Sequence, residues 1–343
     1  MVTKKRTVSS FKPDDNSHAE YQGDSADSSF SDHDDRHASA KPLLKKLKAR
    51  SSEGSRSISG ANIIFSVFSG ASVTTNLPAL PPARPHTLAY HRPLLLDPVG
   101  AGPGGQARID FLKWYDGVKR QRQMPWRQEW IDPEAEGIDS DDFQENLKRC
   151  AYRVWISEVM LQQTRVATVI DYFNRWMEKW PRIEDLAAAS PEEVLAAWKG
   201  LGYYSRSARI HEAAKKVVGT KDLNGMLPEL PESLCKEVPG VGPYTAGAIS
   251  SIVFGHAVPI VDGNVIRVLS RQMGLMANIK EKATLTLLWE TARRLVRRAV
   301  LDYHPDCKKL PDAEQLLRVE GSQLLPRSHV PGNLNQALME LGR

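Results

Sequence analysis

The sequence predicts an all-α fold, and three observations support this class. From about Ile109 onward, residues that suit one buried face recur at the three- and four-residue spacing of a helix. The two clearest series are Trp155, Val159, Gln162 and Val166, and then Val169, Tyr172, Phe173 and Trp176. A helix start is recognisable at Ser190, which caps a helix that Pro191 opens and whose capping box Glu193 completes. No convincing period-two alternation indicates a strand.

Further helices are predicted where the same periodicity continues, over residues 204–218, 243–254, 263–273 and 286–296. Two stretches interrupt the pattern and are predicted loops: the acidic residues 132–145 and the proline-containing residues 303–331.

The N-terminal part, residues 1–105, is predicted to be disordered because it is rich in Ser, Asp, Gly and Pro. It holds an acidic run near residues 24–35 and a basic cluster, KPLLKKLKAR, over residues 41–50. The cluster is either a nuclear localisation signal or a solvated linker, and the tail is a candidate docking region for repair and replication proteins. The folded domain is predicted over residues 106–343.

Composition limits the function classes without choosing one. Lys and Arg number 46 against 41 Asp and Glu, a basic balance that suits a polyanion but does not require one. The three cysteines, Cys150, Cys235 and Cys307, lie too far apart for a compact metal motif and fit a reducing compartment. The first thirty residues lack the apolar core of a secretory signal, and the uncharged residues 57–83 are too polar for a membrane span.

The segment KEVPGVGPYTAGAIS contains the clearest local device, a turn of Gly240, Val241 and Gly242 between two short helices. The glycines permit a tight turn, and the second helix presents free N–H groups and partial positive charge at its start. Such a helix-hairpin-helix binds a DNA phosphate, although a plain helix-turn-helix connection has the same local pattern.

Two carboxylates stand in settings that suit acid chemistry. Glu158 lies among apolar neighbours on a helix, which raises the pKa of a glutamate and suits a general acid, unless the side chain is simply exposed. Asp262 in VDGNVIR is placed to cap a helix, and a carboxylate there is also able to stabilise a cationic sugar.

Side chains that suit nucleic-acid contact surround these blocks. Amides follow Glu158 at Gln162 and Gln163, and WKGLGYYSRSAR offers aromatic surface at Tyr203 with Arg206 and Arg209 beside it as phosphate-binding charge. A buried tyrosine pair is the alternative interpretation of that segment.

Taken in order, these blocks resemble the adenine DNA glycosylases of the MutY type. The matching words are PWR, VWISEVMLQQTRVATVI, WKGLGYYSR, VPGVGPYTAGAI, VDGNVIRVLSR and the final NQALMELG. The resemblance covers about residues 110–301 and 335–342. It implies a two-lobed helix-hairpin-helix glycosylase fold, with the hairpin lobe over roughly residues 150–275 and the second lobe over 106–149 and 276–343.

The resemblance also implies a substrate and residue roles. The expected partner is double-stranded DNA with adenine opposite 8-oxoguanine or guanine, bound by a monomer in the nucleus or also in mitochondria. The adenine is flipped out, Glu158 protonates its N7, and Asp262 stabilises the oxocarbenium-like sugar, directly or through a transient covalent bond. Gln163 and Tyr203 match the residues that wedge beside 8-oxoguanine, and Gln162 and Arg127 match the base pocket.

The hairpin residues and Asn264 are the other positions expected to contact DNA. Tyr244 occupies the place where strand-cutting relatives of the endonuclease III type carry a catalytic lysine, so the resemblance implies a monofunctional glycosylase. Thymine-mismatch glycosylases also have tyrosine there but lack the EVMLQQT block around Glu158.

The chain departs from the family at its iron–sulfur cluster. A [4Fe–4S] cluster is expected for the family, on four cysteines spaced C-x6-C-x2-C-x5-C that begin four residues after the glycine of MELG. That glycine is Gly342, so the positions of all four cysteines are expected to lie beyond Arg343, and none of the three cysteines of the chain stands at such a position. The cluster ligands and the 8-oxoguanine-recognition domain are therefore expected to be absent from this chain, with residues 303–331 as foreign sequence. Two hypotheses follow: a working adenine glycosylase, or an inactive truncated DNA-binding remnant.

Overall fold

The computed structural model describes residues 93–97, 102–132, 140–304 and 325–343. Within these ranges every regular element is helical, which confirms the all-α class. In chain order the elements are η2 (Leu94–Leu96), α2 (Pro103–Arg122), α3 (Ser140–Leu161), α4 (Val166–Lys179), α5 (Ile183–Ala188), α6 (Pro191–Trp198), α7 (Ser205–Gly219), α8 (Pro231–Glu237), α9 (Pro243–Ile252), α10 (Gly263–Met273), α11 (Lys282–Tyr303) and α13 (Val330–Leu341). None of the described helices is long and apolar enough to cross a membrane.

The predicted helices are confirmed, with small shifts at their ends. The capping box at Ser190 forms as expected, since its Oγ accepts from the N–H of Glu193 at 3.2 Å and its own N–H donates to the Glu193 carboxylate at 3.0 Å. Helix α11 is longer than the predicted 286–296, because its buried face continues through Val300 and Leu301.

Two predicted helix boundaries near α3 were wrong. Ser140–Glu145, assigned to an acidic loop, begins α3, because Asp141 and Asp142 in its first turn complement the helix dipole. The series that runs from Trp155 to Val166 spans two helices, since the chain turns after Leu161 and α4 begins at Val166.

The ends of two other predicted irregular regions are also helical. In the region assigned to disorder, Leu96 is fully buried and α2 already begins at Pro103. In the predicted loop 303–331, Val330 and Pro331 open α13, where proline is well tolerated in the first turn. The acidic run, the basic cluster, Cys307 and most of residues 303–331 lie outside the described residues.

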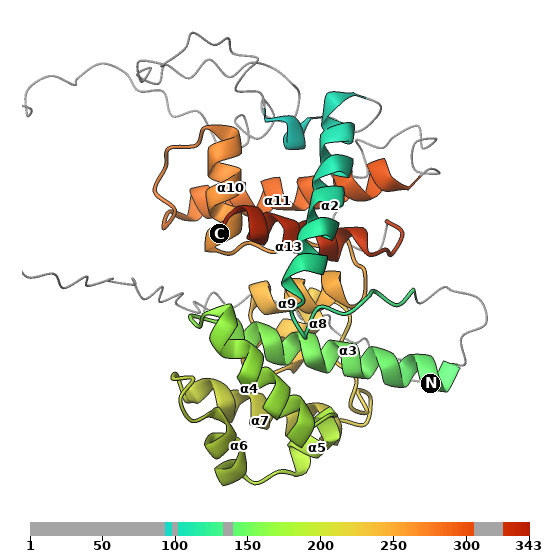
Figure 1. Cartoon of the computed structure of the whole chain (residues 1–343), viewed down its shortest axis with the longest axis vertical. Coiled ribbons are helices and arrows are strands. Elements are labelled where there is room, and N and C mark those ends of the chain that lie inside the picture. Colours follow the sequence, from blue (N-terminus) through green and yellow to red (C-terminus); the bar gives the residue numbers. More distant parts are fainter. Residues whose placement is uncertain (1–92, 98–101, 133–139, 305–324) are drawn as a thin grey trace, which may run out of the picture. The chain divides into compact units, whose positions relative to one another are not determined.

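The described helices form two groups in Figure 1, and their buried side chains form two hydrophobic cores. The first core is rich in aromatic side chains of α3, α4 and α6, such as Trp155, Trp176 and Trp198. The second core is aliphatic and joins α2, α10, α11 and α13. Helix α10 therefore packs with the second core through Val265 and Val268.

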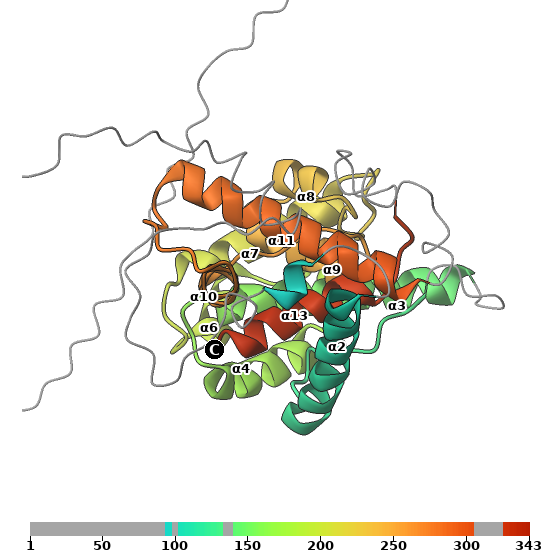
Figure 2. The ribbon, with the colours of Figure 1, turned by 90° about the horizontal axis from the view of Figure 1, so that it is seen from above.

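Helix α13 connects the two groups. It lies between α2 and α11 (Figure 2) and also contacts α9 of the hairpin and α10. Gly332 permits the approach to α9, because a Cβ there would meet the backbone of Ile252 at 2.7 Å. Gly342 permits the approach to α10, where a Cβ would collide with the carbonyl of Asn264. Side chains near the end of α13 are thereby brought beside the start of α9.

Candidate active site

Glu158 lies on the last turns of α3 with only 6% of its surface exposed. Its Oε2 accepts a hydrogen bond from the Tyr244 hydroxyl at 2.7 Å. Burial raises the pKa of Glu158 to about 7, with a further rise from the negative charge of Asp262, while the Tyr244 hydrogen bond and the Arg127 charge act in the opposite direction. The exposed-glutamate alternative is therefore wrong, and Glu158 has the pKa of a proton donor at neutral pH.

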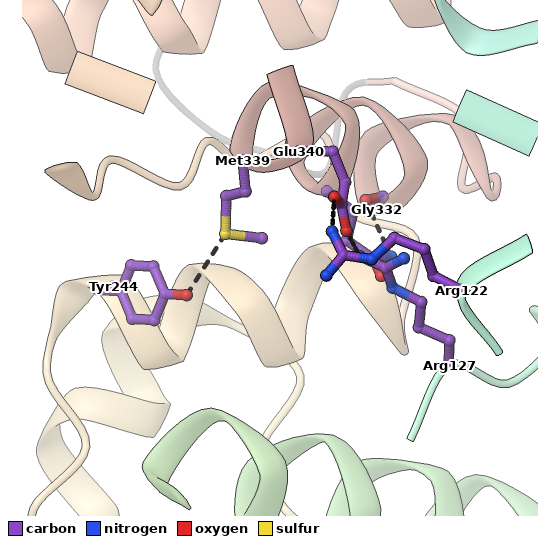
Figure 3. Close-up of polar contacts among 7 residues, drawn as sticks. Arg122, Arg127, Tyr244, Gly332, Met339 and Glu340 are labelled. Carbon is purple, nitrogen blue, oxygen red and sulfur yellow. Dashed lines mark hydrogen bonds and ion pairs between the residues drawn. The ribbon is translucent and has the colours of Figure 1, made fainter. Parts of the chain in front are cut away.

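Tyr244 stands in the first turn of α9, directly after the hairpin turn. Its hydroxyl is hydrogen-bonded to Glu158 and also lies 3.5 Å from the Met339 sulfur of α13, the contact that Figure 3 draws. Burial and the two nearby carboxylates raise the pKa of Tyr244 well above its usual value. The phenol therefore stays protonated and acts as a hydrogen-bond donor.

Asp262 caps α10, as its position in the sequence predicts. Its Oδ1 accepts from the N–H of Val265 at 2.8 Å, and its Oδ2 accepts from the side-chain amide of Asn264 at 2.9 Å. These two bonds fix the position of the Asp262 carboxylate at the start of α10, and its negative charge acts on Glu158 and raises the pKa of that residue.

A buried asparagine of α13 fixes the segment that leads into Asp262. Asn335 accepts from the N–H of Ile260 at 3.2 Å and donates to the carbonyl of Val258 at 2.9 Å and the hydroxyl of Ser251 at 3.0 Å. These bonds tie α9, the approach to α10 and α13 together. Sequence reasoning missed this role, and the only signal for it was that Asn335 belongs to the NQALMELG block.

Arg127 approaches the same centre from the loop after α2. Its Nη2 pairs with the Glu340 carboxylate at 2.5 Å, and Arg122 binds the other oxygen of that carboxylate (Figure 3). Its Nη1 is buried and has no hydrogen-bond partner among the described residues, so one donor remains for a bound group. Glu340 and Arg122 were missed at the sequence level because nothing local links a helix near residue 120 to one near 340.

These contacts and charges bring Glu158, Tyr244, Asp262 and Arg127 into one cluster, which we call the acid centre. Its members come from α3, α9, the start of α10 and the loop after α2. The sequence named all four but gave no measure of their proximity. A neutral carboxyl beside a fixed carboxylate is the pairing needed to protonate a leaving group while stabilising a cation.

Gln162, Gln163 and Tyr203 have exposed side chains and lie in two loops, at residues 162–165 and 199–204, that we call the loop pair. Gln163 and Tyr203 both have left-handed backbone, with φ of 55° and 46°. The Tyr203 side chain is 58% exposed, so it is not part of a buried tyrosine pair. Arg206, expected to offer phosphate-binding charge, is instead only 8% exposed and points inward to backbone carbonyls.

The predicted hairpin forms between α8 and α9. Gly240 has φ of 77°, which explains the glycine, while Gly242 is extended and precedes a helix start without a side-chain cap. The Val241 side chain is buried and its N–H donates to the Val238 carbonyl at 3.2 Å. The N–H groups of the first turn of α9 thus remain free of any side-chain cap, as an anion site requires.

The described residues do not fit an iron–sulfur cluster. No group of three or more His, Cys, Asp or Glu among them is arranged to hold a metal ion, and Cys150 and Cys235 lie in separate helices. Burial raises the pKa of both thiols, which disfavours the thiolate that a cluster needs.

The expected position of the cluster cysteines, beyond Arg343, stays a prediction. Arg343 is exposed and follows directly on the C-cap of α13, and its guanidinium has no lone pair with which to bind a metal. No described residue tests the expectation that the family's cluster cysteines lie beyond Arg343.

Comparison with known proteins identifies related sequences. The family model of the HhH-GPD superfamily base excision DNA repair proteins matches residues 156–294. An adenine DNA glycosylase of Rattus norvegicus is 44% identical over 235 residues, which are 68% of this chain and 37% of the relative. One of Arabidopsis thaliana is 40% identical over 255 residues, or 68% of this chain and 33% of the relative. The chain thus spans about a third of the length of these relatives.

Among solved structures, a thermostable thymine-DNA glycosylase superposes with a TM-score of 0.46 at 22% identity, over 69% of this chain and 85% of that chain.

Proposed function

Because the chain belongs to the HhH-GPD superfamily of base-excision DNA repair proteins, we propose that it is a DNA N-glycosylase that removes adenine from duplex DNA. The observation that carries the proposal is the buried Glu158, whose pKa is raised to about 7 beside the charge of Asp262. Such an acid holds its proton in a large fraction of molecules at neutral pH and still gives it up readily.

The proposed reaction begins with extrusion of adenine from the stack, since its glycosidic bond cannot be reached inside the duplex. Glu158 donates its proton to N7 of adenine. The C–N bond then breaks, with its electron pair leaving on the base, and the sugar becomes an oxocarbenium-like cation. Asp262 stabilises this cation with its fixed negative charge. Water adds to the sugar carbon and gives up a proton to the Glu158 carboxylate, which restores the acid and leaves an abasic site and free adenine.

Tyr244 determines whether the DNA strand is cleaved after the base is released. Its hydroxyl is bonded to Glu158 and stays protonated, and a phenol has no amine with which to form a Schiff base. We therefore expect base release without strand cleavage. Arg127, whose buried Nη1 has no partner among the described residues, is proposed to bind an acceptor atom of the extruded base.

The substrate is proposed to be adenine opposite 8-oxoguanine or guanine. Gln163 and Tyr203 of the loop pair are proposed to enter the duplex beside the opposing base, where an exposed aromatic ring supplies stacking surface. The N-terminus of α9, behind Gly240 and Gly242, is proposed to bind a backbone phosphate.

The test is single-turnover release of adenine from a duplex with adenine opposite 8-oxoguanine. The Glu158→Gln variant should bind this duplex as tightly as the wild type but release adenine about 10²- to 10⁴-fold more slowly, because it lacks the transferable proton. The matched control is Glu145→Gln, an exposed glutamate on the same helix, which should behave as the wild type.

Three other results would each change the assignment. Unchanged release by Glu158→Gln would exclude Glu158 as the proton donor. Release of thymine from a thymine–guanine duplex, with adenine untouched, would identify a mismatch glycosylase of the other base. Tight duplex binding by the wild type with no release of either base would identify an inactive DNA-binding protein.

A further inference from the structure

The loop pair carries two residues in an unfavourable backbone conformation. Gln163 and Tyr203 are not glycines, yet both have positive φ. A left-handed residue with a side chain is unfavourable by itself and persists only where the surroundings hold it in place. The Gln163 side chain is exposed and that of Tyr203 is 58% exposed, so the restraint comes mainly from the groups beneath the loops.

Arg206 supplies the restraint on these two left-handed residues from beneath the loops. This guanidinium, on the first turn of α7, donates to five backbone carbonyls. Nη1 donates to Val159 at 2.7 Å, Gln162 at 2.7 Å and Met160 at 3.3 Å, and Nη2 donates to Leu201 and Gly202, each at 3.3 Å. Each loop thus contributes the carbonyl directly before its left-handed residue, Gln162 before Gln163 and Gly202 before Tyr203.

The chemistry of these acceptors explains why an arginine stands here. The last carbonyls of α3 have no partner within the helix, and a cation at a helix C-terminus satisfies them and complements the helix dipole. A planar guanidinium reaches two loops at once because Nη1 and Nη2 diverge in a fixed fork, whereas the ammonium of a lysine is a single point. The Arg206 guanidinium also lies 5.2 Å from the ring centre of Trp198 and 5.4 Å from that of Tyr203.

We propose that Arg206 is a positioning residue that locks Gln163 and Tyr203 into one rigid wedge, so that both enter the duplex together when adenine is extruded. The inference rests on the proposed function and adds which residue fixes the backbone of the wedge. Arg206 itself contacts no DNA, since its side chain is buried and its donors are directed to the backbone.

The test separates extrusion from chemistry by using two duplexes. In one, adenine lies opposite 8-oxoguanine, and in the other it lies opposite an abasic-site analogue, so that it is unpaired and less costly to extrude. Arg206→Lys should slow adenine release about tenfold on the paired duplex, because the lysine keeps the charge but holds only one loop. On the unpaired duplex the loss should stay below about threefold. The matched control, Arg149→Lys, makes the same substitution on the exposed face of α3 and should change neither rate.

A second measurement needs no catalysis. In a Glu158→Gln background, 2-aminopurine placed at the adenine position should brighten on binding, and this increase should fall when Arg206→Lys is added. Tyr203→Ala should give the same pattern as Arg206→Lys, and the double variant should lose little more than either alone, because both act through one wedge. If Arg206→Lys does not fold, Arg206→Gln, which keeps a planar two-donor amide, takes its place.

Equal losses on the two duplexes, or additive losses in the double variant, would overturn the wedge role and leave Arg206 with a purely structural one. Failure of the wild type to release adenine from either duplex would instead overturn the proposed function, and this inference with it.

Discussion

Around Glu158 the protein buries its polar groups and uses charge to set their protonation, whereas at Gln163 and Tyr203 it exposes the side chains and constrains the backbone. The two regions share one helix end, since α3 carries Glu158 on its final turns and leads directly into Gln163. In the acid centre, burial and the Asp262 charge raise the pKa of Glu158 to about 7. In the loop pair, five carbonyls meet one guanidinium.

The difference teaches that a single helix terminus serves two tasks through different physics. Substitutions in the acid centre should change the rate of adenine release and its pH dependence while leaving extrusion of the adenine from the duplex intact. Substitutions in the loop pair should change extrusion while leaving the pH dependence intact. Both expectations follow from the proposed function, and each is open to direct measurement.

After Glu158→Gln, the largest effect on adenine release is expected for Asp262→Asn. The asparagine oxygen still accepts from the Val265 N–H, so α10 keeps its cap, but the negative charge that stabilises a sugar cation is lost. Adenine release should fall about 10²- to 10³-fold in single-turnover assays. The Asp262 charge raises the pKa of Glu158, so its loss should lower that pKa. As the pH is raised, the residual rate of the variant should therefore decline at a lower pH than the wild-type rate does.

Tyr203→Ala is the control from the other region. It should slow release from paired duplexes with no displacement of the pH profile. A shift of that profile toward alkaline pH in Asp262→Asn would contradict the assigned electrostatics of the acid centre.

The sequence was sufficient for the fold class and for naming candidate site residues, but not for the contacts that hold those residues in place. Helical period and caps found most helices because both are local properties, as at Ser190 and Asp262. The resemblance then singled out Glu158 and Asp262, each of which alone has an ordinary explanation.

The sequence did not reveal the contacts between residues that lie far apart in the chain. Glu340 pairs with Arg127 across 213 positions, and no periodicity or spacing encodes that contact. Arg206 was wrongly assigned to surface charge because the sequence does not show that the end of α3 leaves carbonyls facing α7. The basic cluster at residues 41–50 and the lobe boundaries remain predictions.

An intermediate effect is expected on stability, where Glu158→Gln should stabilise the protein at alkaline pH. The folded pKa of Glu158, about 7, lies above its ordinary value of 4.5, so between these values the folded state keeps a proton that the unfolded state releases. Stability is therefore unaffected below about pH 4.5 and is lost as the pH rises through 7. Glutamine carries no charge, so the variant's advantage should grow from near zero to about 3 kcal/mol by about pH 8.

Urea unfolding near pH 5 and pH 8 measures this difference directly. Glu145→Gln, on the exposed face of the same helix, should show no pH-dependent advantage. If the stability difference between Glu158→Gln and the wild type stays constant between pH 5 and pH 8, burial does not raise the pKa of Glu158. The same experiment on Tyr203→Ala should give a change within about 0.5 kcal/mol at either pH, because that side chain is exposed.

The smallest effect is expected for Tyr244→Phe. The Tyr244 hydroxyl donates to Glu158 and thereby lowers its pKa, so removing it should raise that pKa and extend adenine release to higher pH. The rate at the optimum should change only about two- to threefold, because Tyr244 transfers no proton in the proposed reaction. Met339→Leu is the matched control, since it removes the sulfur contact of the Tyr244 hydroxyl while leaving the hydrogen bond to Glu158. A profile that moves toward acidic pH would show that Tyr244 supports the protonated rather than the ionised form of Glu158, and the balance of charges in the acid centre would then have to be reversed.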